Sequence, residues 1–147
     1  MTLRPIPVQT VQGHPGTTVA RRWVMEPRVV GQARHDLRGY LLAWGHAGLA
    51  DAAELVLSEL VTNALRHADV PQDRLVETRY ARLPDGVRIE VHDADPSLPV
   101  RADPAEDEES GRGLELIDIV TGGRWGACAR DGVGKRIWAE VTVSESV

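Results

Sequence analysis

The fold of this chain is decided by one stretch, Leu57-Ser58-Glu59-Leu60-Val61-Thr62-Asn63-Ala64-Leu65-Arg66-His67-Ala68. At about 100° of rotation per residue, its apolar residues fill one side of an α-helix. Glu59, Asn63 and His67 recur at four-residue spacing and form a polar stripe along the flank of that helix. The sequence therefore predicts a helix that packs on a core and carries a candidate site on its flank.

Length and composition fit a single compact domain. The chain has 147 residues, of which 42% are hydrophobic and none is Phe, so its core must consist of Leu, Val, Ile and Ala. A net charge of −5 argues against direct binding of nucleic acid, which needs a basic excess. The lone Cys128, the lack of a membrane-length apolar run and the lack of an apolar leader predict a cytoplasmic protein without membrane contact.

Two helices are expected before the first clear strand. Pro27 suits the first turn of a helix that begins near Glu26, has apolar residues at three- and four-residue spacing, and ends at Gly45. Asp51 can cap the second helix, which carries the polar stripe and ends before Pro71. Two helices are therefore expected ahead of the sheet strands, and the second carries the candidate site.

The period changes from helical to alternating after these helices. Strands are predicted at residues 75–83 and 87–91, joined by the hairpin turn Pro84-Asp85-Gly86. The alternation of the second strand continues to Asp93 and places this carboxylate on the face that is predicted to be buried. A buried carboxylate at the end of a strand is a candidate for binding.

A loop, a short helix and a second hairpin complete the chain. Three prolines and a run of acids at residues 95–110 predict a mobile loop. Gly111-Arg112-Gly113 then opens an apolar helix that runs from residue 114 to about residue 120. Strands are predicted at residues 124–130 and 135–143.

This order of elements predicts an α+β fold, a two-layer α/β sandwich. About three helices cover one face of an antiparallel or mixed sheet. No internal repeat or second domain boundary is visible, so residues 19–147 are expected to form one domain. Residues 1–18 contain three prolines and no sustained period, and we expect a flexible arm that contributes at most an edge strand.

Three parts of the chain would meet if the helices cover the sheet face that carries Asp93. An amide oxygen such as that of Asn63 can ligate Mg²⁺, which takes its other ligands from water and phosphates. A buried carboxylate can accept a hydrogen bond from the exocyclic amine of adenine. Gly111 and Gly113 would let backbone amides approach phosphate oxygens at a helix N-terminus. Glu59 remains available as a base.

Each of these motifs alone also has a simpler structural explanation. Glu59 and Asn63 are, by themselves, typical of a solvated helix flank, and Asp93 can end a strand or accept from turn amides. His67 suits the C-terminal end of a helix, where a cation is favoured. Paired glycines commonly mark a loop-to-helix junction. The interpretation as a nucleotide site depends on the motifs occurring together and in this order.

In combination and order the motifs resemble the GHKL ATPase superfamily, which includes gyrase, heat-shock chaperones and histidine kinases. The resemblance rests on the N-box-like run from Glu59 to His67, on the acid Asp93, and on Gly111-Arg112-Gly113-Leu114. From about Ala20 to Val143 the chain is most similar to the anti-sigma factor serine/threonine kinases and their actinobacterial relatives. Its closing run, Gly134-Lys135-Arg136-Ile137-Trp138-Ala139-Glu140, is also similar to theirs.

The resemblance implies a Bergerat-type ATPase fold with ATP and Mg²⁺ as ligands. Asn63 would ligate Mg²⁺, Glu59 would deprotonate a protein serine hydroxyl, and Asp93 would recognise adenine. The nucleotide would be held beneath a lid at residues 95–110, and the remaining residues implied to bind it are His67, Gly111, Arg112, Gly113 and Leu114. The implied partners are a sigma factor, an antagonist of the anti-anti-sigma (STAS) type, and a second copy of the chain.

One departure from the superfamily pattern bears on activity. The acid is usually followed by Asp-x-Gly-x-Gly, whereas Asp93 is followed by Ala94-Asp95-Pro96-Ser97. A proline and a second acid would stiffen the start of the lid and place negative charge near the nucleotide. The alternative to a kinase is therefore a non-catalytic module that sequesters a partner, with or without nucleotide. A solitary ATPase of the gyrase or chaperone type would need large additional domains.

Overall fold

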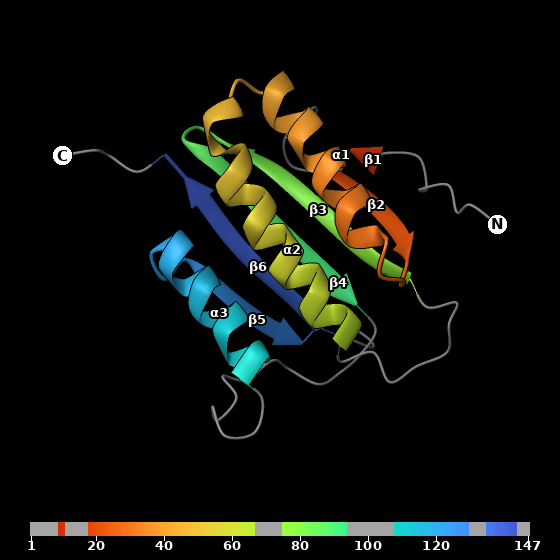
Figure 1. Ribbon diagram of the computed structural model, residues 1–147. Helices are drawn as coiled ribbons and strands as arrows, with labels where there is room; N and C mark the ends of the chain where they lie inside the picture. Colours follow the sequence, from red (N-terminus) through yellow and green to blue (C-terminus); the bar gives the residue numbers. More distant parts are fainter. Residues whose placement is uncertain (1–8, 11–17, 67–74, 94–107, 130–134, 144–147) are drawn as a thin grey trace.

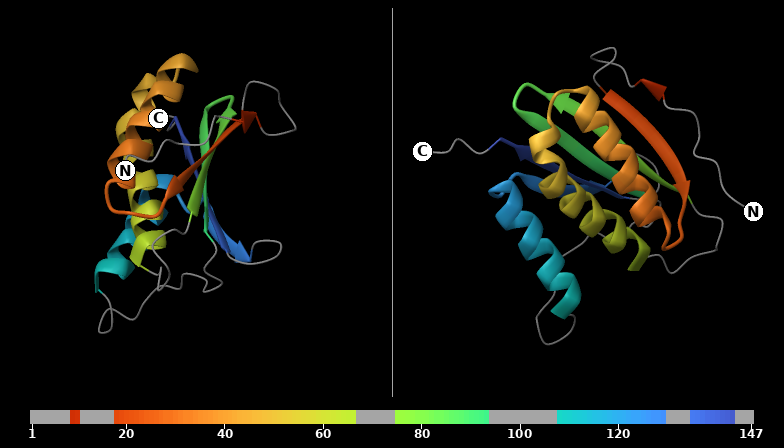
Figure 2. Two further views of the ribbon diagram at one scale, coloured as in Figure 1. Left: turned by 90° about the vertical axis from the view of Figure 1, so that its right-hand side faces the viewer. Right: turned by 45° about the horizontal axis from the view of Figure 1, so that its top comes forward.

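The computed structural model describes residues 9–10, 18–66, 75–93, 108–129 and 135–143. They form the predicted α+β sandwich, in which helices cover one face of a six-stranded antiparallel sheet (Figures 1 and 2). The helices are α1 (Val29–Ala43), the short 3-10 helix η1 (Ala47–Leu49), α2 (Ala50–Arg66) and α3 (Glu108–Thr121). The sheet has the order β1-β2-β3-β4-β6-β5, with β1 (Gln9–Thr10), β2 (Thr18–Val24), β3 (Leu75–Leu83), β4 (Gly86–Asp93), β5 (Trp125–Ala129) and β6 (Lys135–Thr142).

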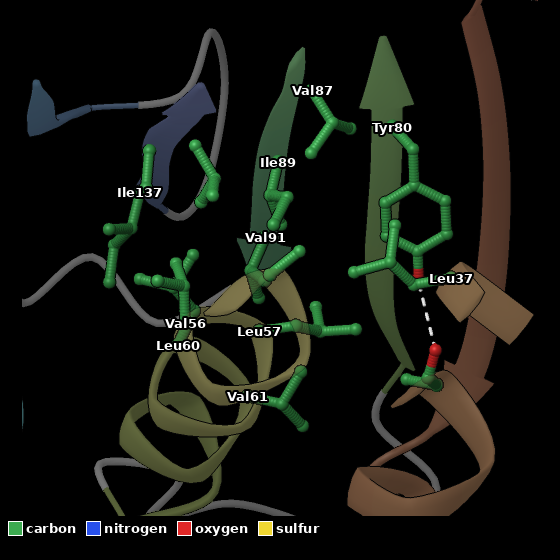
Figure 3. Close-up of a cluster of buried hydrophobic side chains, with 14 of the residues drawn as sticks. Leu37, Val56, Leu57, Leu60, Val61, Tyr80, Val87, Ile89, Val91 and Ile137 are labelled. Carbon is green, nitrogen blue, oxygen red and sulfur yellow. Dashed lines mark hydrogen bonds between the residues drawn. The ribbon is translucent and has the colours of Figure 1, made fainter. Parts of the chain in front are cut away.

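Helix α2 packs on the sheet through the apolar side that the sequence predicts. Leu57, Leu60 and Val61 are fully buried, and Figure 3 shows them between this helix and strand β4. The burial of such side chains is the main favourable contribution to folding.

No helix in the described part of the chain is long and apolar enough to cross a membrane.

Helix α1 begins at Val29 rather than near Glu26. The residue before a proline is disfavoured in helical conformation, and the chain turns here instead, with the Val29 amide donating to the Glu26 carbonyl at 3.0 Å. Gly45 ends the helix region as predicted, because its φ of 79° is a conformation that glycine adopts without strain. The helix therefore keeps its predicted buried stripe and its predicted end.

Strand β2 was absent from the sequence prediction because adjacent arginines interrupt its apolar alternation. In the sheet these arginines point to opposite faces. Arg21 Nε lies 2.9 Å from an Asp36 carboxylate oxygen on α1, and Arg22 Nε lies 3.1 Å from a Glu77 carboxylate oxygen on β3. Within the predicted N-terminal arm, Gln9–Thr10 pairs with β2 as an edge strand, and residues 1–8 and 11–17 lie outside the described residues.

The β3–β4 hairpin forms as predicted, and β4 continues to Asp93. A Cβ atom at Gly86 would lie 2.0 Å from the Val141 carbonyl oxygen, so only glycine allows β4 to approach β6 at this point. Asp93 lies on the buried face with 1% exposure, as the alternation predicts. The hairpin thereby fixes the position of the candidate carboxylate.

Helix α3 differs from its prediction. It begins at Glu108 instead of Leu114, so Gly111 and Gly113 lie within its first two turns and do not form a loop ahead of it. Residues 108–110, which were predicted to belong to the loop, form the first turn of the helix. Acidic residues are favoured in this turn, because the N-terminal end of a helix carries a partial positive charge. The rest of the predicted lid, up to residue 107, lies outside the described residues.

The sheet face that points away from the helices is rich in ion pairs. Arg88 contacts carboxylate oxygens of Glu90 at 2.8 Å and of Glu140 at 3.1 Å, and its guanidinium lies 4.3 Å from the Trp138 ring centroid. Burial opposes ionisation of Glu90, but hydrogen bonds from His92 and Arg88 outweigh it and lower the pKa of Glu90 to about 2. We call this surface the charged sheet face.

One partly buried carboxyl group on α1, that of Asp36, makes stability depend on pH. Burial raises the pKa of Asp36 to about 6, and Arg21 only partly offsets it. The folded protein therefore keeps this proton up to about pH 6, whereas the unfolded chain releases it near pH 3.8. We expect the stability of the wild type relative to Asp36→Asn to fall by about 1–3 kcal/mol as pH rises from 4 to 7.

Urea unfolding of both proteins at several pH values measures this effect. Asp51→Asn serves as the control, since the Asp51 side chain is fully exposed. A stability difference between the wild type and Asp36→Asn that is constant from pH 4 to pH 7 would contradict the assignment.

Candidate functional site

One edge of the sandwich brings the sequence motifs together. The C-terminal end of α2, the end of β4, the beginning of α3 and the beginning of β6 all lie at the lower edge in Figure 1 and remain together in Figure 2. Helix α2 contacts α3, β4 and β6 directly. Residues that are far apart in the sequence therefore share one end of the fold.

Asn63 is buried on the flank of α2. Its side chain is 8% exposed, and its Oδ1 atom has no hydrogen-bond partner among the described residues. Buried amide oxygens are normally bonded, and leaving one unbonded costs about 1–3 kcal/mol. A solvated helix flank does not explain this side chain. An amide oxygen is a ligand that Mg²⁺ accepts, so Asn63 fits the predicted role.

Glu59 lies one turn before Asn63, where α2 meets α3. A Cβ atom at Gly113 would lie 2.6 Å from Glu59 Oε2, so the carboxylate lies against the backbone of α3. Gly113 thus makes room for Glu59. The sequence predicts that this glycine lets the backbone approach phosphates, whereas in the structure its close neighbour is the Glu59 side chain.

The other predicted residues differ in their placement. Leu114 is 1% exposed and belongs to the hydrophobic core. Gly111 and Arg112 lie in the first turns of α3, at the edge where the motifs gather. His67 lies outside the described residues.

Asp93 ends β4 and lies directly opposite Lys135, the first residue of β6, in the antiparallel register. Lys135 is also 1% exposed, and its Nζ atom has no hydrogen-bond partner within the described part of the chain. Lys135 is not among the candidate residues predicted from the sequence. The alternation of β6 could have indicated that Lys135 is buried, because Lys135 falls on the same face as Ile137, Ala139 and Val141.

The described residues contain no group of three or more His, Cys, Asp or Glu side chains that could hold a metal ion. A site built from Asn63 alone would have to complete the coordination of Mg²⁺ with water and nucleotide phosphates. Such partial coordination by protein is usual for Mg²⁺ in enzymes that transfer phosphate. The donor set therefore fits a metal that arrives with a nucleotide.

The family described as the histidine kinase-like ATPase domain matches residues 24–121, about two thirds of the chain. The match includes Glu59, Asn63, Asp93 and Gly113. The chain belongs to this family. Its predicted place in the GHKL superfamily is confirmed at this level. A comparison of this chain with curated proteins finds no match.

The family match ends at Thr121, before β5 and β6. Strand β6 nevertheless continues the sheet next to β4 and brings Lys135 to the candidate site. The part of this ATPase domain that lies beyond the match therefore supplies a side chain at the site.

Proposed function

We propose that this histidine kinase-like ATPase domain binds ATP with Mg²⁺ and transfers the γ-phosphoryl group to a serine or threonine hydroxyl of a protein. The proposal is carried by one observation: Asn63, whose buried Oδ1 has no hydrogen bond to a described residue, lies on the last turns of α2, and the end of this helix shares an edge of the fold with the end of β4, where Asp93 is buried. Glu59 lies one turn earlier on α2, against the beginning of α3. These side chains offer a metal ligand, a base and an acceptor for adenine.

In this proposal Asn63 Oδ1 ligates Mg²⁺, which neutralises phosphate charge when bound. The Asp93 carboxylate accepts a hydrogen bond from the exocyclic amine of adenine. Helix α3 begins at the same edge, and the free amides and dipole of a helix N-terminus favour phosphate groups. Positioning and charge stabilisation supply most of the catalysis in phosphoryl transfer.

Glu59 acts as the general base. Its carboxylate takes the proton of the hydroxyl group, and the hydroxyl oxygen forms a bond to the γ-phosphorus. The bond between the γ-phosphorus and the β,γ-bridging oxygen breaks, and ADP leaves. The close approach of Gly113 supports this role, because it holds the carboxylate at the junction of α2 and α3.

We propose a partner of the anti-anti-sigma (STAS) type and, through it, regulation of a sigma factor. The similarity of the α2 stretch and of the run from Gly134 to Glu140 to the anti-sigma factor kinases supports this choice. A small α/β partner with an accessible serine would be the substrate. The resemblance also favours a homodimer and a cytoplasmic location.

Two measurements in sequence test the proposal. Calorimetric titration with ATP should show binding that strengthens when Mg²⁺ is present. Radiolabelled ATP should then label a candidate STAS-type partner, and a Ser→Ala change in that partner should remove the label. The absence of ATP binding at millimolar nucleotide would contradict the proposal at its first step.

A non-catalytic regulatory module is the second candidate function. The missing glycines after Asp93 favour it, because Pro96 restricts the lid that would enclose the phosphates. Binding of ATP and of the partner without any transfer of label would support sequestration over phosphorylation.

A further inference from the structure

A buried lysine lies beside the carboxylate that is proposed to recognise adenine. Lys135 and Asp93 face each other in the register of β6 and β4, and each is 1% exposed. Side chains that are directly opposite in an antiparallel pair project from the same face, with Cβ atoms about 5 Å apart. The amino group and the carboxylate therefore share the part of the sheet that the helices cover.

Packing does not explain why a lysine occupies this position. The next residues on the same face of β6 are apolar, namely Ile137, Ala139 and Val141. Burying an amino group is unfavourable unless it is paired and hydrogen-bonded, yet no described residue forms a hydrogen bond with Lys135 Nζ. An apolar side chain would fill this place without that penalty. A bound molecule with a hydrogen-bond acceptor would remove it.

We propose that Lys135 is a second base-contacting residue, whose Nζ donates a hydrogen bond to a ring nitrogen of adenine. This inference rests on the proposed function and deepens it. A carboxylate can only accept, and a lysine amino group donates. The exocyclic amine of adenine is a donor with a ring-nitrogen acceptor on either side, N1 and N7. An acceptor and a donor placed side by side, as Asp93 and Lys135 are, match that edge of the base.

The same pair would meet guanine differently. In the pose of adenine, the guanine O6 oxygen would face the Asp93 carboxylate without a proton between them, so guanine would have to shift until Lys135 donates to O6 and Asp93 accepts from the N1 hydrogen. In the adenine pose Asp93 accepts from the exocyclic amine, and Lys135 adds affinity. Because the family match ends at Thr121, this contact comes from a part of the chain that the match does not include.

The test combines a side-chain change with changes in the ligand. Lys135→Met keeps the length of the side chain and removes the donor. Calorimetry would measure the dissociation constants of ATP, 1-deaza-ATP and 7-deaza-ATP for the wild type and for this variant. Arg136→Met is the matched control, since Arg136 is the next residue of β6 and its guanidinium contacts Cys128 Sγ at 3.1 Å.

The wild type is expected to bind one of the two deaza analogues about tenfold more weakly than ATP. Lys135→Met should bind ATP about tenfold more weakly than the wild type and should no longer distinguish ATP from that analogue. Arg136→Met should keep the wild-type affinities. The analogue that loses affinity identifies the ring nitrogen that Lys135 contacts.

Three results would overturn the inference while ATP binding stands. The first is equal affinity of the wild type for ATP and both analogues. This measurement uses only the wild type and so does not depend on whether a variant folds. The second is an unchanged ATP affinity in Lys135→Met, which would leave Lys135 a structural partner of Asp93. The third is a tighter ATP affinity in Lys135→Met, which would mean that the amino group occupies the place of the base. If the wild type binds no ATP, the proposed function fails and the inference fails with it.

Discussion

Glu59→Ala is expected to slow phosphoryl transfer to the partner by about 10²–10⁴-fold, the usual contribution of a positioned general base. The affinity for ATP should remain close to that of the parent, because the proposed adenine and Mg²⁺ contacts belong to Asp93 and Asn63. A single-turnover rate with radiolabelled ATP measures the first quantity, and calorimetry measures the second. A loss confined to the rate would assign Glu59 to the chemical step.

Two further variants sharpen this experiment. Glu115→Ala removes an exposed carboxylate from α3 and should leave both quantities unchanged. Gly113→Ala places a methyl group 2.6 Å from the observed position of Glu59 Oε2, so the carboxylate must move. This variant should lose part of the rate and keep its ATP affinity. If Glu59→Ala phosphorylates the partner as fast as the parent, Glu59 is not the base.

Asn63→Ala is expected to remove the Mg²⁺-dependent part of ATP binding. The parent should bind ATP about 10–100-fold more tightly in Mg²⁺ than in EDTA, a range typical for the loss of a metal-site contact, and the variant should bind ATP alike in both. The reason is that Asn63 supplies the one amide oxygen that the proposal assigns to the metal. Calorimetric titrations in the two buffers measure the difference.

The same change should not destabilise the protein in the absence of nucleotide. Asn63 Oδ1 is buried and forms no hydrogen bond with the residues that the structure describes, so its removal relieves an unfavourable desolvation and leaves only a small cavity. The melting temperature of Asn63→Ala should equal or exceed that of the parent. Ser58→Ala is the control on the same helix, since the Ser58 hydroxyl donates to the Glu54 carbonyl at 2.7 Å. Persistent Mg²⁺ dependence in Asn63→Ala would remove Asn63 from the metal site.

Local patterns were sufficient to predict most of the fold. The apolar side of α2 and the β3–β4 hairpin follow from helical period, alternation and turn residues, and these are short-range properties of the chain. The burial of Asp93 follows from the same alternation. These features needed no knowledge of which elements touch.

The features that were missed depend on contacts between distant segments. Strand β2 pairs with β3 and buries Val19 and Trp23, while Arg21 and Arg22 lie beside carboxylates on α1 and β3. The strand itself does not reveal these partners. The contact of Gly113 with Glu59 depends on how α3 lies against α2. The importance of Lys135 became visible only when β6 was placed beside Asp93. The sequence therefore predicts the burial of Asp93 but not the neighbours of Glu59 and Asp93, and the roles of the candidate residues stay predictions.

The charged sheet face limits where another protein can attach. Its arginines and glutamates already satisfy one another, and a protein that covered them would have to strip their water without offering better partners. If the protein phosphorylates a partner as proposed, that partner would dock on the helix layer or at the edge where α2 ends. It would then reach the phosphate end of the proposed nucleotide without crossing the sheet.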